Sequence, residues 1–225
     1  MKFKGLLLGM AMVLASVFTN AQNPYYTADL SIGSTTNLFV GALSFNRTHT
    51  ILSEKLHLGY GLRFNLHTGS NQTYITAPFK YTGEGLIDSM SIDNINTMGL
   101  SASINLGFSI SEKLMVGFNI DALGLSFGGA QDVRIKQWVD DPSGATQTLT
   151  TATPTTLNLL LVGDNDIGTL NSEFYIRYMF NDNLGARLGM SMFFSEYTTE
   201  AAGHDNNKRF RNKIQYPFIA LSYKL

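Results

Sequence analysis

LHLGYGLRFNLH, residues 56–67, is the stretch that decides the fold of this chain. Every second residue is bulky and apolar, whereas the residues between them are small or polar and include Arg63 and Asn65. Strict alternation with a period of two predicts a β-strand with one apolar and one polar face. The polar face has no aliphatic side chain that a soluble core would need. We therefore expect the apolar face to contact lipid and the polar face to line a narrow lumen.

Similar alternation recurs along the chain and predicts eight strands in all. The other seven are residues 26–33, 39–50, 100–110, 114–127, 170–180, 184–194 and 219–225. In 114–127 the apolar positions change from even-numbered to odd-numbered residues. One extra residue in a strand moves every later side chain to the other face of the sheet, so this change predicts a β-bulge near 121–124. Strands of about 9–13 residues suit a tilted crossing of the hydrocarbon layer.

The connections between these strands alternate in length. Three turns, 53–55, 111–113 and 181–183, are very short, and 34–37 is a further short polar turn. Residues 68–96, 128–169 and 198–212 lack sustained alternation and are predicted loops. Within the second of them, 133–139 could extend the fifth strand, and 157–162 could pack against the barrel mouth or extend the sixth strand. Short turns at one end and long loops at the other are typical of outer-membrane barrels. A hairpin signature, Ser-Glu-Lys-Leu-x-x-Gly-aromatic, occurs twice, at 53–60 and 111–118.

Residues 1–21 are a predicted secretory signal peptide, and residues 22–225 a single barrel domain. Lys2 and Lys4 precede an apolar run at 6–18, and Ala21 provides a small residue for cleavage before Gln22. An uncleaved anchor helix is the alternative. Elsewhere there is no run of about 18 apolar residues that could form a membrane-spanning helix. The chain has no cysteine, which excludes disulfides and lipoprotein anchoring.

The charges follow the polar faces of the expected strands. Removing Lys2 and Lys4 with the leader changes the formal net charge from −1 to −3, and no basic stripe indicates nucleic acid as a partner. The inward charges are Arg63, Asp121, Glu173, Arg177, Arg187 and Lys224. Eight strands enclose little space, so side chains fill the interior. We expect Arg63, Glu173, Arg177 and Arg187 to form a hydrogen-bonded ion network that occludes the lumen.

The signal peptide, the eight alternating segments and the end Tyr223-Lys224-Leu225 resemble the small eight-stranded outer-membrane β-barrel proteins of Gram-negative bacteria, the OmpA/OmpX-like or porin-family barrels. The resemblance implies an all-β, antiparallel, up-and-down transmembrane barrel in the outer membrane. It also implies insertion by the barrel-assembly machinery and contact with outer-membrane lipid and lipopolysaccharide; we expect a monomer. Family members usually end on an aromatic residue, whereas here Leu225 is last and Tyr223 takes the outward aromatic position.

No catalytic, cofactor-binding or metal-binding residue is predicted, and no cofactor. Residues 124–128 match G-x-S-x-G, but a nucleophile elbow needs a following helix, which the flanking sequence does not predict. His57 and His67 share a strand face about 33 Å apart, and His49 points to the other side of the sheet from His57; together with His204 they suggest no metal pair.

Two polar loop segments are candidate ion sites. Asp164-Asn165-Asp166 has oxygen ligands but lacks the ligand number of a calcium loop, so loop capping is expected. Residues 208–211 with Lys213 form a cation cluster. It is expected to be a solvated loop, with contact to lipopolysaccharide phosphates as the alternative.

These features predict a non-enzymatic outer-membrane barrel with a structural, surface-interaction or porin-like role. One alternative is an outer-membrane lipid-modifying hydrolase or acyltransferase, which would need a serine, a histidine and an acid near the outer rim, where His67 is expected. The other is a soluble calycin-like lipid binder, which would need an apolar interior and a polar exterior.

Overall fold

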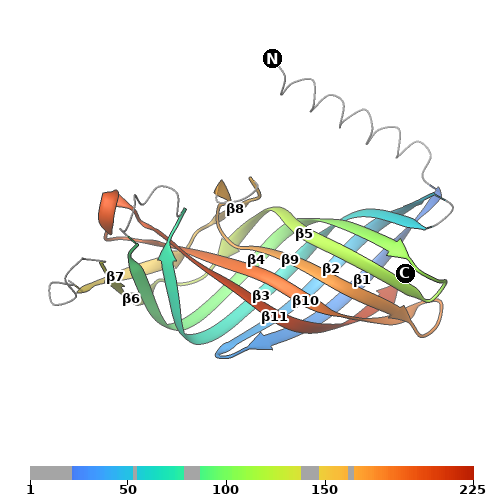
Figure 1. The fold of residues 1–225 in the computed structure, drawn as a ribbon, viewed down its shortest axis with the longest axis horizontal. Helices are drawn as coiled ribbons and strands as arrows, with labels where there is room; N and C mark the ends of the chain where they lie inside the picture. Colours follow the sequence, from blue (N-terminus) through green and yellow to red (C-terminus); the bar gives the residue numbers. More distant parts are fainter. Residues whose placement is uncertain (1–21, 53–54, 79–86, 138–146, 162–164) are drawn as a thin grey trace, which may run out of the picture.

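Eight antiparallel strands close into a ring in this computed structural model, which describes residues 22–52, 55–78, 87–137, 147–161 and 165–225. The ring consists of β1 (Gln22–Thr35), β2 (Leu38–Ile51), β3 (Leu56–Thr76), β4 (Ser89–Ser109), β5 (Leu114–Phe127), β9 (Leu170–Met179), β10 (Leu184–Thr199) and β11 (Arg209–Lys224). Each strand pairs with the next in this order, and β11 pairs with β1 (Figure 1). The predicted up-and-down barrel is confirmed. The expected signal peptide lies outside the described residues.

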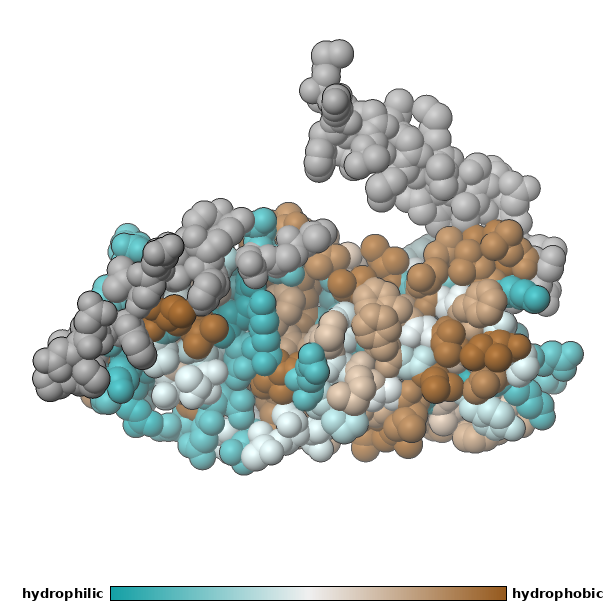
Figure 2. Space-filling model, in the orientation of Figure 1, coloured by the Kyte–Doolittle hydropathy of each residue, from teal (hydrophilic) through white to brown (hydrophobic). Residues whose placement is uncertain are grey.

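The ring is apolar outside and polar inside. Leu188 on β10 is 65% exposed, whereas its neighbour Arg187 is 2% exposed. Large apolar side chains on all eight strands are exposed in the same way, and in Figure 2 they gather over the part of the molecule that contains β5, β9 and β10. In water such an exterior would be a very large apolar patch, so it is the lipid-facing surface of a transmembrane barrel. The calycin-like alternative, which needs the opposite polarity, is wrong.

The details of the ring follow the sequence closely. Ala102 faces Leu123 while Ser103 faces Asp121, so one residue of β5 bulges out where the parity change predicted it. Tyr223 points outward as expected. The turn between β1 and β2 is short and uses Asn37 with a φ of 62°, so it is an exception to long loops at that end of the barrel. Among the described residues, no helix is long and apolar enough to cross a membrane.

The prediction of a loop at 68–96 is wrong, because β3 continues to Thr76 and β4 begins at Ser89. The two strands stay paired through this region, with Tyr74 opposite Met90. At Asn71, which has a φ of 51°, the buried side of β3 changes from odd to even residues, and β4 changes side at 93–94. The break in alternation therefore marks a change of face, and the strand itself does not end.

The region 128–169 also contains strands that the sequence did not predict clearly. β6 (Gln131–Lys136) is a separate strand that follows a break at 128–130 and pairs with β4, the partner of β5, so residues 133–136 continue the line of the fifth strand whereas Gln137 lies outside it. The Thr-rich segment expected to be an open loop is instead β7 (Gln147–Pro154), which pairs with β6 and with β10. Threonine is β-branched and favours strands. β8 (Leu157–Leu159) pairs with the end of β5, so the segment packs against the barrel, and it does not extend the sixth ring strand, which begins at Leu170.

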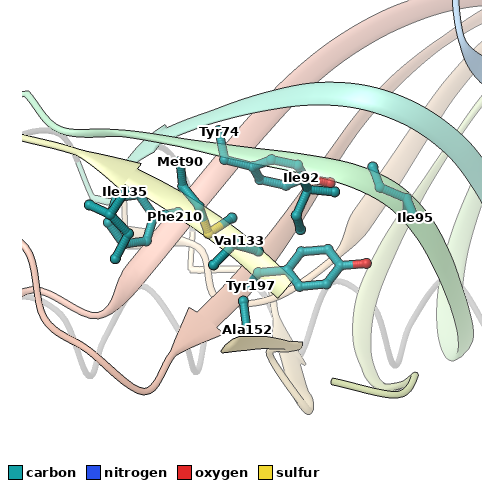
Figure 3. Packing of buried hydrophobic residues seen from close by; sticks show 9 residues of the cluster. All are labelled: Tyr74, Met90, Ile92, Ile95, Val133, Ile135, Ala152, Tyr197 and Phe210. Atoms are coloured by element: carbon teal, nitrogen blue, oxygen red, sulfur yellow. The ribbon is translucent and has the colours of Figure 1, made fainter. Parts of the chain in front are cut away.

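Beyond the eight-stranded ring, a second ring is formed by the extended ends of β3, β4, β10 and β11 together with β6 and β7. It closes because β11 leaves β1 and pairs Phe210 with Thr76 of β3. We call this ring the six-stranded extension. Its interior is apolar, and all six strands contribute to the core drawn in Figure 3: Tyr74, Met90, Ile92, Ile95, Val133, Ile135, Ala152, Tyr197 and Phe210. The predicted loop at 198–212 shrinks accordingly to residues 200–208, which include a short 3-10 turn, η4 (His204–Asn206).

Candidate functional site

The lumen of the eight-stranded ring is crossed by a set of buried ion pairs that we call the lumen ion network. It contains three arginines and three acids: Asp29, Arg63, Asp121, Glu173, Arg177 and Arg187. Arg63 lies 3.2 Å from Asp121 and 3.3 Å from Glu173. Arg187 lies 3.5 Å from Glu173 and 3.6 Å from Asp29, which also pairs with Arg177 at 3.4 Å. The six charges balance, as buried charges must.

Five strands hold this network across the lumen. Asp29 lies on β1, Arg63 on β3, Asp121 on β5, Glu173 and Arg177 on β9, and Arg187 on β10. Amides complete the hydrogen bonding: Asn119 donates to Glu173 at 2.8 Å, and Asn46 donates to Asp29 at 2.9 Å.

An aromatic ring lies beside the network. The Arg187 guanidinium stacks 4.7 Å from the centre of the Tyr175 ring. A Cβ at Gly117 would come within 2.4 Å of that ring, so glycine is required there for Tyr175 to fill the lumen.

The predicted participants Arg63, Glu173, Arg177 and Arg187 are therefore brought together, and that prediction is confirmed. Asp29 was missed, and Asp121 was expected on the polar face but not in the network. Three arginines and one glutamate do not balance, so charge neutrality was the signal that could have identified the two missing acids. The sixth inward charge, Lys224, lies at the short-turn end of the lumen, with its amino group 5.0 Å from the centre of the Tyr25 ring.

An apolar cluster begins beside the network and continues toward the long-loop end of the lumen. Residues of β2, β9, β10 and β11 form it: Leu38, Val40, Tyr175, Phe193, Tyr216, Phe218 and Ala220. His67 joins them, 1% exposed and with its ring 4.3 Å from that of Phe193. Neither ring nitrogen of His67 has a hydrogen-bond partner among the described residues. The expected place of a hydrolytic triad at the outer rim thus holds a buried histidine with no acid or serine bonded to it.

The cation cluster expected at 208–211 is largely internal. Arg209 donates to both carboxylate oxygens of Glu196, at 2.8 and 2.9 Å, and Arg211 donates to Glu196 at 2.8 Å. Phe210 between them is part of the core of the six-stranded extension. Because Glu196 is fully buried, this second ion cluster ties β10 to β11 and leaves only Lys208 and Lys213 of the cluster exposed.

The short-turn end of the lumen opens into a cavity of about 990 Å³, which we call the vestibule. Tyr25, His57, Ser109, Arg177 and Lys224 are among its lining residues. His57 lies between two hydroxyl groups, with Ser109 Oγ at 2.7 Å from Nε2 and Tyr25 Oη at 3.1 Å from Nδ1. A serine bonded to a histidine can act as a nucleophile when a carboxylate stabilises the imidazolium. In this protein the group bonded to His57 Nδ1 is the Tyr25 phenol, which orients the imidazole ring but does not supply a negative charge.

The other sequence candidates are structural. Ser126 of the G-x-S-x-G match is buried in a strand and bonded to the Asn158 side chain, and the next element is β6. Asp166 accepts a hydrogen bond from the Leu161 backbone at 2.7 Å, which confirms capping, whereas Asp164 lies outside the described residues. His204 pairs with Asp88 at 2.6 Å. No group of three or more metal-ligating side chains occurs within the described ranges.

One charge on the barrel was missed by sequence reasoning because it breaks the pattern. Arg47 has the same parity on β2 as Phe45, which is 49% exposed on the outer surface. Its guanidinium donates to Tyr60 Oη at 3.4 Å, and Tyr60 is itself an outward residue. The outward residues of β2 are odd-numbered, and continuing this rule from Phe45 to the next odd-numbered residue would have placed Arg47 on the lipid side.

Several solved structures are similar to this chain over most of its length. They include Neisserial surface protein A (9% identity, 91% of this chain and 99% of that chain, TM-score 0.37), the N-terminal β-barrel domain of Pseudomonas aeruginosa OprF (9%, 91% and 99%, 0.37) and a major outer membrane protein from Thermus thermophilus (12%, 91% and 100%, 0.43). No protein-family model and no curated protein sequence matches the chain. The resemblance to small eight-stranded OmpA-like barrels is confirmed at the level of the fold, by the ring of strands described above.

Proposed function

We propose that this protein is a non-conducting outer-membrane barrel that presents a rigid extracellular platform and performs no catalysis. One observation carries the proposal: beyond the vestibule, side chains fill the interior at successive levels. The lumen ion network spans the eight-stranded ring, and an apolar core fills the six-stranded extension above it. Side chains that fill a small barrel leave no aqueous path.

The location follows from the surface and from the turns. A barrel with an apolar exterior belongs in a bilayer, and the secretory leader that the sequence predicts at 1–21 supports the outer membrane as that bilayer. Both described chain ends lie at the short-turn end, which then faces the periplasm, and the six-stranded extension projects outward. We propose the barrel-assembly machinery and lipopolysaccharide as its partners in the envelope, and a monomer as its working state.

The extension supports a surface-interaction or structural role. It is held by strand pairing on every side, by its own core and by the Glu196 ion cluster. It also carries a further tie, in which buried Asp88 accepts the backbone N–H of His204 at 2.7 Å and so links the β3–β4 connection to the β10–β11 connection. A platform built in this way holds its connections in fixed positions, which suits recognition of another surface molecule.

Conductance across a planar lipid bilayer tests the closed lumen. The purified barrel, first shown to be folded by its heat-modifiable migration on a gel, is expected to give no stable openings. Openings of porin size would overturn the proposal.

Turnover of a fluorescent ester by the same sample tests the absence of catalysis. Ser109 bonded to His57 is the serine–histidine pair that the vestibule offers. We expect no difference in hydrolysis between the protein and its Ser109→Ala variant. Hydrolysis that disappears in the variant would assign the lipid-modifying alternative to the vestibule.

A further inference from the structure

Arg47 is a charged side chain on the lipid-facing surface of the barrel. Its neighbours Asn46 and Thr48 are buried in the lumen, so Arg47 points the other way. It lies near the short-turn end of β2, which ends at Ile51. Arginine stays charged at every accessible pH, and a charge in contact with hydrocarbon needs either water or a counter-ion.

Within the described ranges, Arg47 has aromatic neighbours and no acidic partner. The guanidinium lies 5.8 Å from the centre of the Tyr26 ring and donates to Tyr60 Oη at 3.4 Å. His49, the next outward residue, stacks on Tyr60 with ring centres 6.4 Å apart. No carboxylate among the described residues pairs with Arg47, and its Nε is buried without a hydrogen-bond partner. The side chain is thus positioned by rings that cannot neutralise it.

The position along the barrel indicates which anion is available. Tyr26 and Tyr60 are outward tyrosines near one end of the apolar surface, where aromatic residues mark the boundary between hydrocarbon and headgroups. The anionic groups at that depth in a bilayer are lipid phosphates. A guanidinium binds phosphate through N–H donors, and because Arg47 Nε is covered by the protein, its terminal amino groups are the donors that a phosphate would meet.

We propose that Arg47, Tyr26 and Tyr60 form a binding site for the glycerophosphate group of a phospholipid in the leaflet at the short-turn end. The phosphate accepts hydrogen bonds from Arg47, and the Tyr60 hydroxyl, which accepts from Arg47, donates its own proton to a second phosphate oxygen. The acyl chains then lie along Phe45 and Leu43, the outward residues that follow on β2 toward the membrane centre. That this leaflet is periplasmic rests on the proposed function, but the site itself rests only on the barrel surface.

Native mass spectrometry of the purified barrel in detergent tests the site, with phosphatidylglycerol as the probe and diacylglycerol of the same acyl chains as the phosphate-free control. The protein is expected to retain one phosphatidylglycerol and no diacylglycerol. Arg47→Gln is expected to weaken retention on the order of ten-fold, the usual loss for one charge-assisted hydrogen-bonding group. Arg134→Gln is the matched control, because Arg134 is exposed on the extension and paired with Asp93, and it is expected to change nothing.

Equal retention by the Arg47→Gln variant would overturn the proposal, because Arg47 would then satisfy its charge by reaching water. Equal retention of diacylglycerol by the unmodified protein would overturn it too, since acyl packing alone would explain binding; this comparison needs no variant to fold. Channel openings in a planar bilayer would contradict the closed lumen of the proposed function, but they would leave both lipid-retention results unchanged.

Discussion

At the scale of single residues, the lumen is held by charges that are stable only together. Arg63 is 1% exposed and contacts two carboxylates, and Asp121 is fully buried. Arg63 also donates to Asn119 at 2.5 Å, so its position is fixed by groups on β5 and β9. Taking any one of these charges out of water is expensive, and the attraction of its partners compensates for that loss. The balance between three positive and three negative groups therefore matters more than any single contact.

Removing one charge from this set is expected to destabilise the barrel strongly. Arg63→Gln leaves Asp121 and Glu173 with too little positive charge, and we expect the free energy of unfolding to fall by about 3–5 kcal/mol. Urea titration of the barrel in lipid vesicles, followed by its heat-modifiable band, measures the change. The double variant Arg63→Gln with Asp121→Asn restores neutrality and is expected to recover part of the loss.

The matched control for this experiment is again Arg134→Gln. Arg134 and Asp93 form an exposed pair, with 48% and 55% of their side-chain surfaces accessible, and solvent screening makes such a pair worth about 1 kcal/mol at most. If Arg63→Gln costs no more than this control, water must replace the arginine in the lumen, and the network is not what holds the strands together.

At the scale of elements, alternation predicted the strands well only where they cross the bilayer. There each strand meets lipid outside and a polar lumen inside, so apolar and polar residues alternate without interruption. Above the bilayer the environments reverse: Tyr74 and Phe210 point inward, and polar residues face water. The reversal interrupts the period at Asn71 on β3 and at 93–94 on β4, and a search for unbroken alternation ends there.

The candidate site was predictable to the same extent. Parity placed Arg63, Glu173, Arg177 and Arg187 inward, and in a narrow barrel inward charges must meet. Their partner carboxylates, the vestibule and the Ser109–His57 contact depend on which strands lie beside each other and on the register between them. β5 pairs with β9 although β6, β7 and β8 separate the two strands in the chain, and no local pattern specifies this neighbour.

The core of the six-stranded extension contains two buried tyrosines whose titration reports on its stability. Tyr74 donates or accepts a hydrogen bond with Ser195 at 2.8 Å, and Tyr197 does so with Thr97 at 2.6 Å. Burial raises the pKa of Tyr74 and the pKa of Tyr197 above the ordinary value of 10. The neutral phenols are therefore favoured in the folded extension.

The sign of the pH effect follows from this shift. Above pH 10 the unfolded chain loses these two protons while the folded extension keeps them, so the free energy of unfolding of the extension falls as the pH rises further. We expect the difference in ultraviolet absorbance between the unmodified protein and its Tyr74→Phe, Tyr197→Phe double variant to show two phenolates that form late, together with loss of amide protection in the extension. The Tyr74→Phe, Tyr197→Phe double variant should lack these late-titrating groups; if its titration matches that of the unmodified protein, the two rings are accessible to hydroxide.

At the scale of the whole molecule, the two rings share four strands but close independently. None of the pairings that close the eight-stranded ring involves β6 or β7, whereas the six-stranded extension depends on both. The lumen ion network lies within the first ring and the apolar core within the second. The extension should therefore come apart at a lower free energy than the barrel beneath it, as local units commonly do.

Deleting residues 131–154 separates the two closures. The deletion removes β6 and β7. Residues 128–130 and 155–156 then form the connection between β5 and β8, which has the length of an ordinary hairpin loop. β5 and β8 are already paired at Leu125 and Leu157, so the shortened connection joins neighbouring strands. The extension loses Val133, Ile135 and Ala152 from its core, so we expect its remaining strand ends to lose amide protection. The barrel should still show heat-modifiable migration and no conductance, because the ion network is untouched. Stable openings in this variant would show that the extension, and not the network, keeps the pore closed.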